Sequence, residues 1–154
     1  MQVTAKTWVN LPLEQTWAEF NDKEQSTQWV KSLVRIDKLE GETLQAGTVY
    51  NYIYQEGKGQ NEMREEIERV DAPNRIESLY STKVMQSQHA FSFAKIDDNT
   101  TEVTGEMDLQ PTNFIMKLML RFLKGPVRKR LKEDLERFSA LMNEKHNSSS
   151  ANNI

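Results

Sequence analysis

The chain of 154 residues contains no cysteine. This absence excludes disulfide bonds, zinc sites built on thiolates and catalysis by a cysteine nucleophile, and it fits a reducing compartment. Histidine is scarce as well, because His89 and His146 are the two in the chain. The sequence holds no HExxH pair, no phosphate-binding glycine-rich loop and no nucleophile elbow. We therefore expect no metal site and no cofactor, and we assign no catalytic residue.

Long apolar runs are also missing. No segment approaches the roughly 20 apolar residues that cross a bilayer, and the first residues lack the apolar core of a signal peptide. Charged residues make up 28% of the chain, which is typical of a soluble protein. We expect one cytoplasmic domain over residues 1–146, followed by a disordered polar tail over residues 147–154.

Acidic residues are absent from one stretch of the sequence. Residues 112–132 contain no Asp or Glu, and the basic residues there are Lys117, Arg121, Lys124, Arg128, Lys129, Arg130 and Lys132. The rest of the chain is strongly acidic. The basic segment is either a solvated helix face that neutralises this acidity or a surface that meets anionic lipid. Nucleic acid is not an expected partner, since the acidic remainder would repel its phosphates.

The order of segments whose apolar residues repeat with the spacing of a strand or of a helix predicts an α+β fold. A strand is predicted over residues 2–10, followed by a short helix starting near Pro12 and a second one starting near Ser26 that carries Trp29 and Val30. Period-two segments with short turns then predict an antiparallel meander over 33–39, 48–55, 60–70, 75–81, 84–96 and 101–109. A long final helix follows, in which Gly125-Pro126 should produce a kink or a break. Its apolar stripe is Val127, Leu131, Leu135, Phe138 and Met142.

Several local features match one protein family. They are Pro12 followed by Trp17 and Phe20, then Trp29, Gly47-Thr48 at a strand start, the hairpin sequence of residues 70–76, and the spaced leucines of the last helix. In this order, over residues 2–145, the chain resembles the START-like (SRPBCC) ligand-binding superfamily, and within it the small bacterial polyketide cyclase/dehydrase-like proteins.

The resemblance implies a helix-grip fold of the START and Bet v 1 type. In such a fold, a curved antiparallel sheet of about six to seven strands wraps around a long C-terminal helix, and a cavity lies between them. The resemblance also implies binding, and in some members transport, of a lipid or another hydrophobic small molecule. A minority of the superfamily are enzymes, so a cyclase or dehydratase with an acid/base residue in the cavity is one alternative. The other is a protein-interaction or membrane-surface module that uses residues 113–132.

Strand alternation predicts which polar side chains face the cavity. If the apolar positions of the strands point inward, Glu65, Ser78, Tyr80, Ser87, His89 and Gly105 share their face. A buried glutamate is costly unless it is paired or hydrogen-bonded, and a cavity that admits water or a polar head group would satisfy it. The alternative is a bulge near residues 68–70 that reverses the alternation and returns Glu65 to solvent.

His89 has three interpretations: a structural histidine of the sheet, a hydrogen-bond partner of the ligand, or a general base. The last role requires a neighbour such as Glu65 or Tyr80 to orient the ring and tune its pKa.

The predicted ligand contacts combine apolar side chains, which supply affinity, with polar ones that orient the ligand. Tyr50 and Tyr52 share one face of a strand, and Trp29 lies where the second helix would close one mouth of the cavity. The full set is Trp29, Tyr50, Tyr52, Met63, Glu65, Ile67, Tyr80, His89, Phe91, Met107, Phe114 and Leu118.

The segment 113–123 is apolar nearly all round its helix, with Lys117 and Arg121 as exceptions after Asn113. Such a helix is not expected on a protein surface with one side in water. It is either sandwiched in the core, buried in a homodimer interface, or placed in transient contact with a membrane surface.

Overall fold

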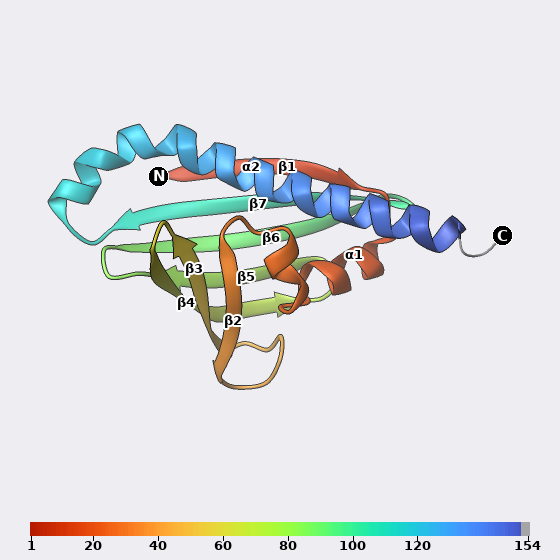
Figure 1. Cartoon of the computed structure of the whole chain (residues 1–154), viewed down its shortest axis with the longest axis horizontal. Coiled ribbons are helices and arrows are strands. Elements are labelled where there is room, and N and C mark those ends of the chain that lie inside the picture. Colours follow the sequence, from red (N-terminus) through yellow and green to blue (C-terminus); the bar gives the residue numbers. More distant parts are fainter. Residues whose placement is uncertain (152–154) are drawn as a thin grey trace.

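A computed structural model describes the backbone of residues 1–151 and the side chains of residues 1–148. Within that part, one antiparallel sheet has the strand order β1-β7-β6-β5-β4-β3-β2 (Figure 1). The strands are β1 (Gln2–Val9), β2 (Leu33–Glu40), β3 (Val49–Glu56), β4 (Gly59–Asp71), β5 (Arg75–Ser81), β6 (Met85–Asp97) and β7 (Thr100–Pro111). The helices are α1 (Leu13–Phe20), the single 3-10 turn η1 (Gln25–Gln28) and the long α2 (Phe114–Ala151). The expected α+β helix-grip fold is confirmed.

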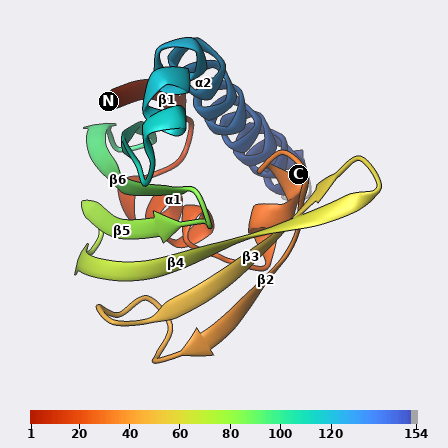
Figure 2. The same ribbon diagram turned by 90° about the vertical axis from the view of Figure 1, so that its left-hand side faces the viewer.

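The sheet curves strongly, and α2 runs lengthwise along β1 and β7 (Figure 1). Figure 2 shows α1 inside the curve, with α2 across the open side of the sheet. The core therefore lies between the concave face of the sheet, the two short helical elements and the inward face of α2.

Alternation in β1 and β4 sets which side chains enter this core. Val3, Ala5, Thr7 and Val9 are buried along β1, because successive side chains of a strand point to opposite faces. In β4 the pairing register with β5 shifts between Ile67 and Arg69, so the suspected bulge exists. It follows Glu65 along the strand, and Glu65 stays on the concave face with only 2% of its surface exposed.

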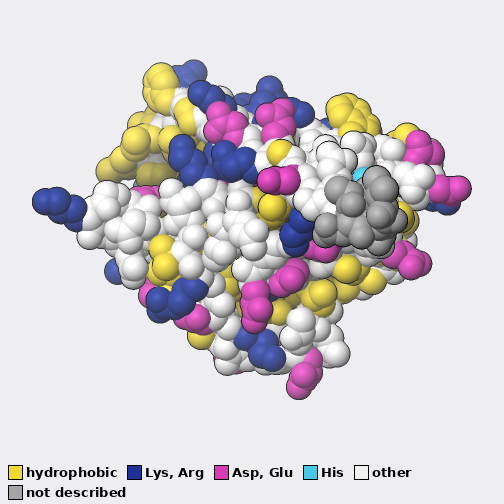
Figure 3. Space-filling view, turned by 45° about the vertical axis from the view of Figure 1, so that its right-hand side comes forward, with side chains coloured by type: hydrophobic (Ala, Val, Ile, Leu, Met, Phe, Trp, Pro, Cys, Tyr) yellow, Lys and Arg dark blue, Asp and Glu magenta, His cyan; other side chains and the backbone are white. Residues whose placement is uncertain are grey.

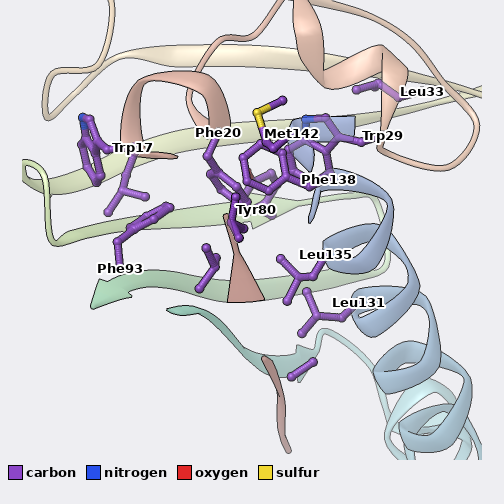
Figure 4. Close-up of a cluster of buried hydrophobic side chains, with 14 of the residues drawn as sticks. Trp17, Phe20, Trp29, Leu33, Tyr80, Phe93, Leu131, Leu135, Phe138 and Met142 are labelled. Atoms are coloured by element: carbon purple, nitrogen blue, oxygen red, sulfur yellow. The ribbon is translucent and has the colours of Figure 1, made fainter. Parts of the chain in front are cut away.

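The inward face of α2 is the predicted apolar stripe. Leu131, Leu135, Phe138 and Met142 are all buried, and Figure 4 shows Leu131 and Leu135 on the helix beside the aromatic cluster of Phe20, Trp29 and Phe138. Gly105 on β7 allows close packing here. A Cβ at this position would lie 2.9 Å from Phe91 Cε1 and 3.1 Å from Leu131 Cδ1.

The second helical element is shorter than expected, and Trp29 comes directly after it. Tertiary contacts hold Trp29 there, because its ring centroid lies 5.0 Å from that of Phe20 and 5.2 Å from that of Phe138. Arg137 Nε also donates to the Trp29 carbonyl oxygen at 2.9 Å. Trp29 is thus held in place by its contacts with Phe20 and α2, and not by a longer second helix.

α2 is a single helix that contains Pro126, and it bends within its first part (Figure 1). It continues to Ala151, past the residue-146 boundary at which we expected a polar tail to begin. Residues 152–154 of that expected tail lie outside the described residues.

The beginning of α2 is not sandwiched in the core, so that interpretation of residues 113–123 was wrong. Leu120 is buried, but Phe114 and Phe122 are 73% and 77% exposed. Among the described residues, no helix is both long and apolar enough to cross a membrane.

Candidate ligand-binding site

Two adjoining cavities lie between α2 and the concave face of the sheet. The outer cavity has a volume of about 710 Å³ and reaches the β3–β4 hairpin. The inner cavity, of about 110 Å³, extends toward Glu65 and Ser78. Their shared wall shows that they form one site, and it consists of Val30, Tyr54, Met63, His89, Met107, Leu131 and Asp134.

The residues that line the outer cavity differ in polarity between its interior and its mouth. In the outer cavity, Val127 and Leu131 of α2 and Met63 of β4 line the passage inward, which is mainly apolar, with Asp134 as a charged member. The mouth is charged and polar, with Lys83 before β6 and Arg130 on α2 among its residues. The site is therefore a mainly apolar passage from a polar mouth to a polar floor.

Most of the predicted ligand contacts meet at this site. Trp29, Tyr52, Met63, Glu65, Tyr80, His89, Phe91 and Met107 line the inner cavity. The strand residues converge because β3, β4, β5, β6 and β7 are successive neighbours in the sheet, with Glu65 opposite Tyr80 and His89 opposite Met107.

Four predicted contacts lie elsewhere. Tyr50 and Ile67 are buried in the core without lining either cavity. Phe114 and Leu118 are exposed on α2, because the inward positions in that part of the helix are those of Met116, Leu120 and Leu123. Helical geometry then directs Phe114 and Leu118 to another side of α2.

The floor of the inner cavity is a cluster of four polar side chains, in which Lys23, Tyr52 and Tyr80 surround Glu65. Tyr52 donates from its hydroxyl to Glu65 Oε1 at 2.7 Å, and Tyr80 donates to Oε2 at 2.6 Å. Lys23 Nζ lies 2.7 Å from Glu65 Oε1 and 2.6 Å from the Tyr52 hydroxyl oxygen. Both carboxylate oxygens are thus hydrogen-bonded, which is the condition for burying this charge.

These contacts determine the charge of Glu65. Burial alone would raise its pKa, but the positive charge of Lys23 and the hydrogen bonds from Lys23, Tyr80 and Tyr52 together hold the pKa below its ordinary value. Burial and the nearby carboxylate raise the pKa values of Tyr52 and Tyr80 well above the usual value for tyrosine. At neutral pH the floor therefore contains an ionised Glu65 and two neutral tyrosines.

His89 stacks on Tyr80, with 4.1 Å between ring centroids. Burial lowers the pKa of His89 to about 4, and the charge of Glu65 offsets this only in part. Among the described residues, none forms a hydrogen bond with the His89 ring. At neutral pH it is an uncharged ring in the cavity wall and has no carboxylate to orient it.

Lys23 and Asp134 line the site but are not among the residues predicted from the sequence. Lys23 follows α1, where the Asn21 side chain donates to the Trp17 carbonyl oxygen at 2.9 Å as the helix ends. Asp134 lies away from the predicted apolar stripe of α2, but it lines both cavities and accepts the Lys31 backbone N–H at 3.1 Å. A buried glutamate requires a cationic or hydrogen-bonding partner. The predicted burial of Glu65 was therefore the feature of the sequence that could have pointed to a partner such as Lys23.

Comparison with known proteins identifies the family. Residues 1–143 match the family model described as "Polyketide cyclase / dehydrase and lipid transport". The chain therefore belongs to this family. A comparison with curated proteins finds no match.

Solved structures share the fold at low sequence identity. Protein TTHA0849 from Thermus thermophilus has a TM-score of 0.76 at 16% identity, covering 94% of this chain and 99% of its own. A START superfamily protein from Mycobacterium smegmatis has a TM-score of 0.74 at 13% identity, with 92% and 98% covered. The Zhui aromatase/cyclase from Streptomyces sp. R1128 has a TM-score of 0.77 at 13% identity, with 94% of each chain covered.

A double-mutant cycle tests the cluster at the cavity floor. We expect Glu65→Gln and Lys23→Met each to lower the free energy of unfolding by about 3 kcal/mol, because each leaves its partner buried without a counter-charge. The loss in the double variant should be smaller than the sum of the two single losses. Urea unfolding at neutral pH measures all three variants.

The matched control for this cycle is Glu66→Gln, on the same strand. Glu66 has a side chain that is 44% exposed and pairs with Arg64 at 3.3 Å, so we expect a change within about 0.5 kcal/mol. Additive losses at Lys23 and Glu65 would contradict the coupled cluster.

His89 predicts a specific dependence of stability on pH. The pKa is about 4 in the folded protein against an ordinary value of 6.5, so between these values the unfolded chain binds more protons. Stability should therefore fall as pH drops below 6.5, by about 2 kcal/mol at pH 5 and by about 3 kcal/mol in total once pH is below the folded pKa. In His89→Gln this part of the dependence should disappear.

Urea unfolding at about pH 7 and about pH 5 measures this difference. The contribution of Glu65 lies outside this range, because its stabilisation is present above the ordinary value of 4.5 and is lost as pH falls through the lower folded pKa. Burial raises the pKa of Asp134, so protonation of this residue stabilises the folded protein as pH falls. This effect is expected to be the same in wild type and His89→Gln. If the free energy of unfolding fell between about pH 7 and about pH 5 by the same amount in His89→Gln as in wild type, His89 would not be the source of this pH dependence.

Proposed function

We propose that this protein binds a hydrophobic small molecule or lipid in the two adjoining cavities. The apolar body of the ligand lies in the outer cavity against Met63, Val127 and Leu131, and its polar end points toward the floor formed by Lys23, Glu65 and Tyr80. The observation that carries the proposal is a mainly apolar passage that ends on a buried charge whose two oxygens are both hydrogen-bonded. The lipid transport named in the description of the family supports the same ligand class.

The dimensions and donors of the site define the ligand further. A volume of about 710 Å³ lies within the range of about 300–1,000 Å³ that is usual for small-molecule sites. The inner cavity, at about 110 Å³, has room for a small polar group. Lys23 Nζ has three protons and uses two on Glu65 and Tyr52. The third suits a hydroxyl or carbonyl oxygen of the ligand.

Trp29 provides a second polar group for the ligand. Its ring lines the inner cavity, and its Nε1–H is buried without an acceptor in the described part of the chain. A buried donor without a partner is unfavourable, so a ligand oxygen that reaches this group would be stabilised. A ligand with oxygen at one end and an extended apolar body fits these features.

A cyclase or dehydratase is the second candidate, and the family description and the aromatase/cyclase neighbour are its support. The chemistry of the cavity favours binding. Glu65 has both oxygens engaged and a lowered pKa, which makes it a weak base. His89, with a pKa of about 4, is a weak base as well. Catalytic turnover that is lost in His89→Gln with binding retained would favour the enzyme.

Filling the outer cavity should remove ligand binding. We expect Val127→Trp to weaken binding of the probe anilinonaphthalene sulfonate at least about tenfold, equivalent to about 1.4 kcal/mol, because the indole would occupy the passage. Fluorescence titration measures the affinity. Native mass spectrometry of the purified protein should show a bound hydrophobic compound that is depleted in the same variant.

The control for this experiment is Val34→Trp. Val34 is 42% exposed on β2 and lines neither cavity, so the same change in side-chain size should leave binding intact. Thermal unfolding verifies that both variants are folded. Equal probe affinity in the two variants would place the bound molecule outside this site and contradict the proposal.

A further inference from the structure

The beginning of α2 carries an unusual concentration of exposed apolar side chains, which we call the α2 tip. It consists of Phe114 (73% exposed), Ile115 (70%), Leu118 (53%), Met119 (48%) and Phe122 (77%). Hydrophobic side chains gather beside Lys and Arg at the upper left of Figure 3, toward the end of the molecule at which α2 begins in Figure 1. Contiguous exposed patches of this kind usually mark an interaction site.

The α2 tip is additional to the face with which this helix contacts the rest of the protein. Met116, Leu120 and Leu123 point inward, and the side chains of the tip lie on another side of the helix. Packing within one copy of the chain therefore leaves the tip uncovered.

Basic side chains flank the α2 tip. Lys117, Arg121, Lys124 and Arg128 are exposed and follow one another at intervals of three or four residues, so they share one side of the helix. There is no acidic residue between positions 112 and 132. The exposed part of this helix is therefore apolar on one side and purely cationic on the adjacent side.

This charge pattern distinguishes between two partners. In a symmetric dimer the same patch meets itself, which would bring the two sets of basic residues together. An anionic lipid surface instead offers negative head groups to the basic side and an apolar interior to the tip. The electrostatics favour the lipid surface.

We propose that the α2 tip docks on the surface of an anionic lipid bilayer. The five apolar side chains enter the boundary between head groups and acyl chains, while Lys117, Arg121 and Lys124 bind the head groups. The contact is interfacial, with the helix lying on the bilayer.

Docking would bring the mouth of the outer cavity close to the bilayer. Val84, 44% exposed, lines the outer cavity together with Lys83, and its carbonyl oxygen accepts the hydroxyl of Thr112 at 2.8 Å, two residues before α2. A route for a lipid between bilayer and cavity follows from this position. The route rests on the proposed function, whereas docking itself does not.

Co-sedimentation with vesicles tests the docking. The wild-type protein should bind vesicles of phosphatidylcholine with phosphatidylserine, bind pure phosphatidylcholine vesicles weakly, and lose affinity as salt increases. Phe114→Glu/Phe122→Glu should bind the anionic vesicles at least about tenfold more weakly. Ile96→Glu, at a 55% exposed position near the β6–β7 turn, is the matched control and should bind like wild type.

Two results would overturn the proposal. One is equal vesicle binding by the double variant and the Ile96→Glu control. The other is a wild-type dimer in sedimentation equilibrium that the double variant abolishes, together with no vesicle binding by wild type, because a second copy would then cover the tip. Anilinonaphthalene sulfonate titration without vesicles separates this proposal from the proposed function, since the double variant should retain cavity binding.

Discussion

The buried carboxylate of Glu65 is the constraint on which the rest of the site depends. An ionised carboxylate without partners in a protein interior costs several kcal/mol, so the fold has to supply hydrogen bonds and an opposite charge. β3 and β5 supply the hydroxyls of Tyr52 and Tyr80, and the segment after α1 supplies Lys23. The strand register and the course of the chain after α1 are thus coupled through one side chain.

The position of α2 explains why space remains above this cluster. The helix packs along β1 and β7, at one side of the curved sheet, and α1 lies within the curve. Phe20, Trp29 and Phe138 form an aromatic cluster where the short elements meet the second half of α2. Toward the first half of α2, the volume between Met63 and Leu131 is left unfilled as the outer cavity.

The parts of the structure with regular periodicity could be predicted from the sequence. The alternation of side chains along each strand correctly predicted that Glu65, Tyr80 and His89 lie on the concave face. The bulge in β4 does not change this for Glu65, because it comes after that residue. The long stripe from Leu131 to Met142 follows the helical period in the same way. These patterns are local, so a single sequence contains them.

Features that depend on long-range packing could not be predicted. Lys23 lies in a short irregular segment, and its partner is 42 residues away. Asp134 lies outside the apolar stripe of α2, but the segment after η1 reaches that side of the helix, where the Lys31 backbone N–H donates to the Asp134 carboxylate at 3.1 Å. Phe114 and Leu118 are large apolar residues of the kind usually found in a protein core. The position of α2 in the fold shows that their side of the helix stays exposed.

The most direct test of the central claim is an NMR titration of protein labelled with 13C in its methionine methyl groups. Met63 and Met107 line both cavities, whereas Met119 is exposed on the α2 tip. If a hydrophobic molecule enters the site, anilinonaphthalene sulfonate should shift the signals of Met63 and Met107 and leave that of Met119 in place. A shift of Met119 with Met63 and Met107 unchanged would show binding at the surface and contradict a ligand-binding cavity.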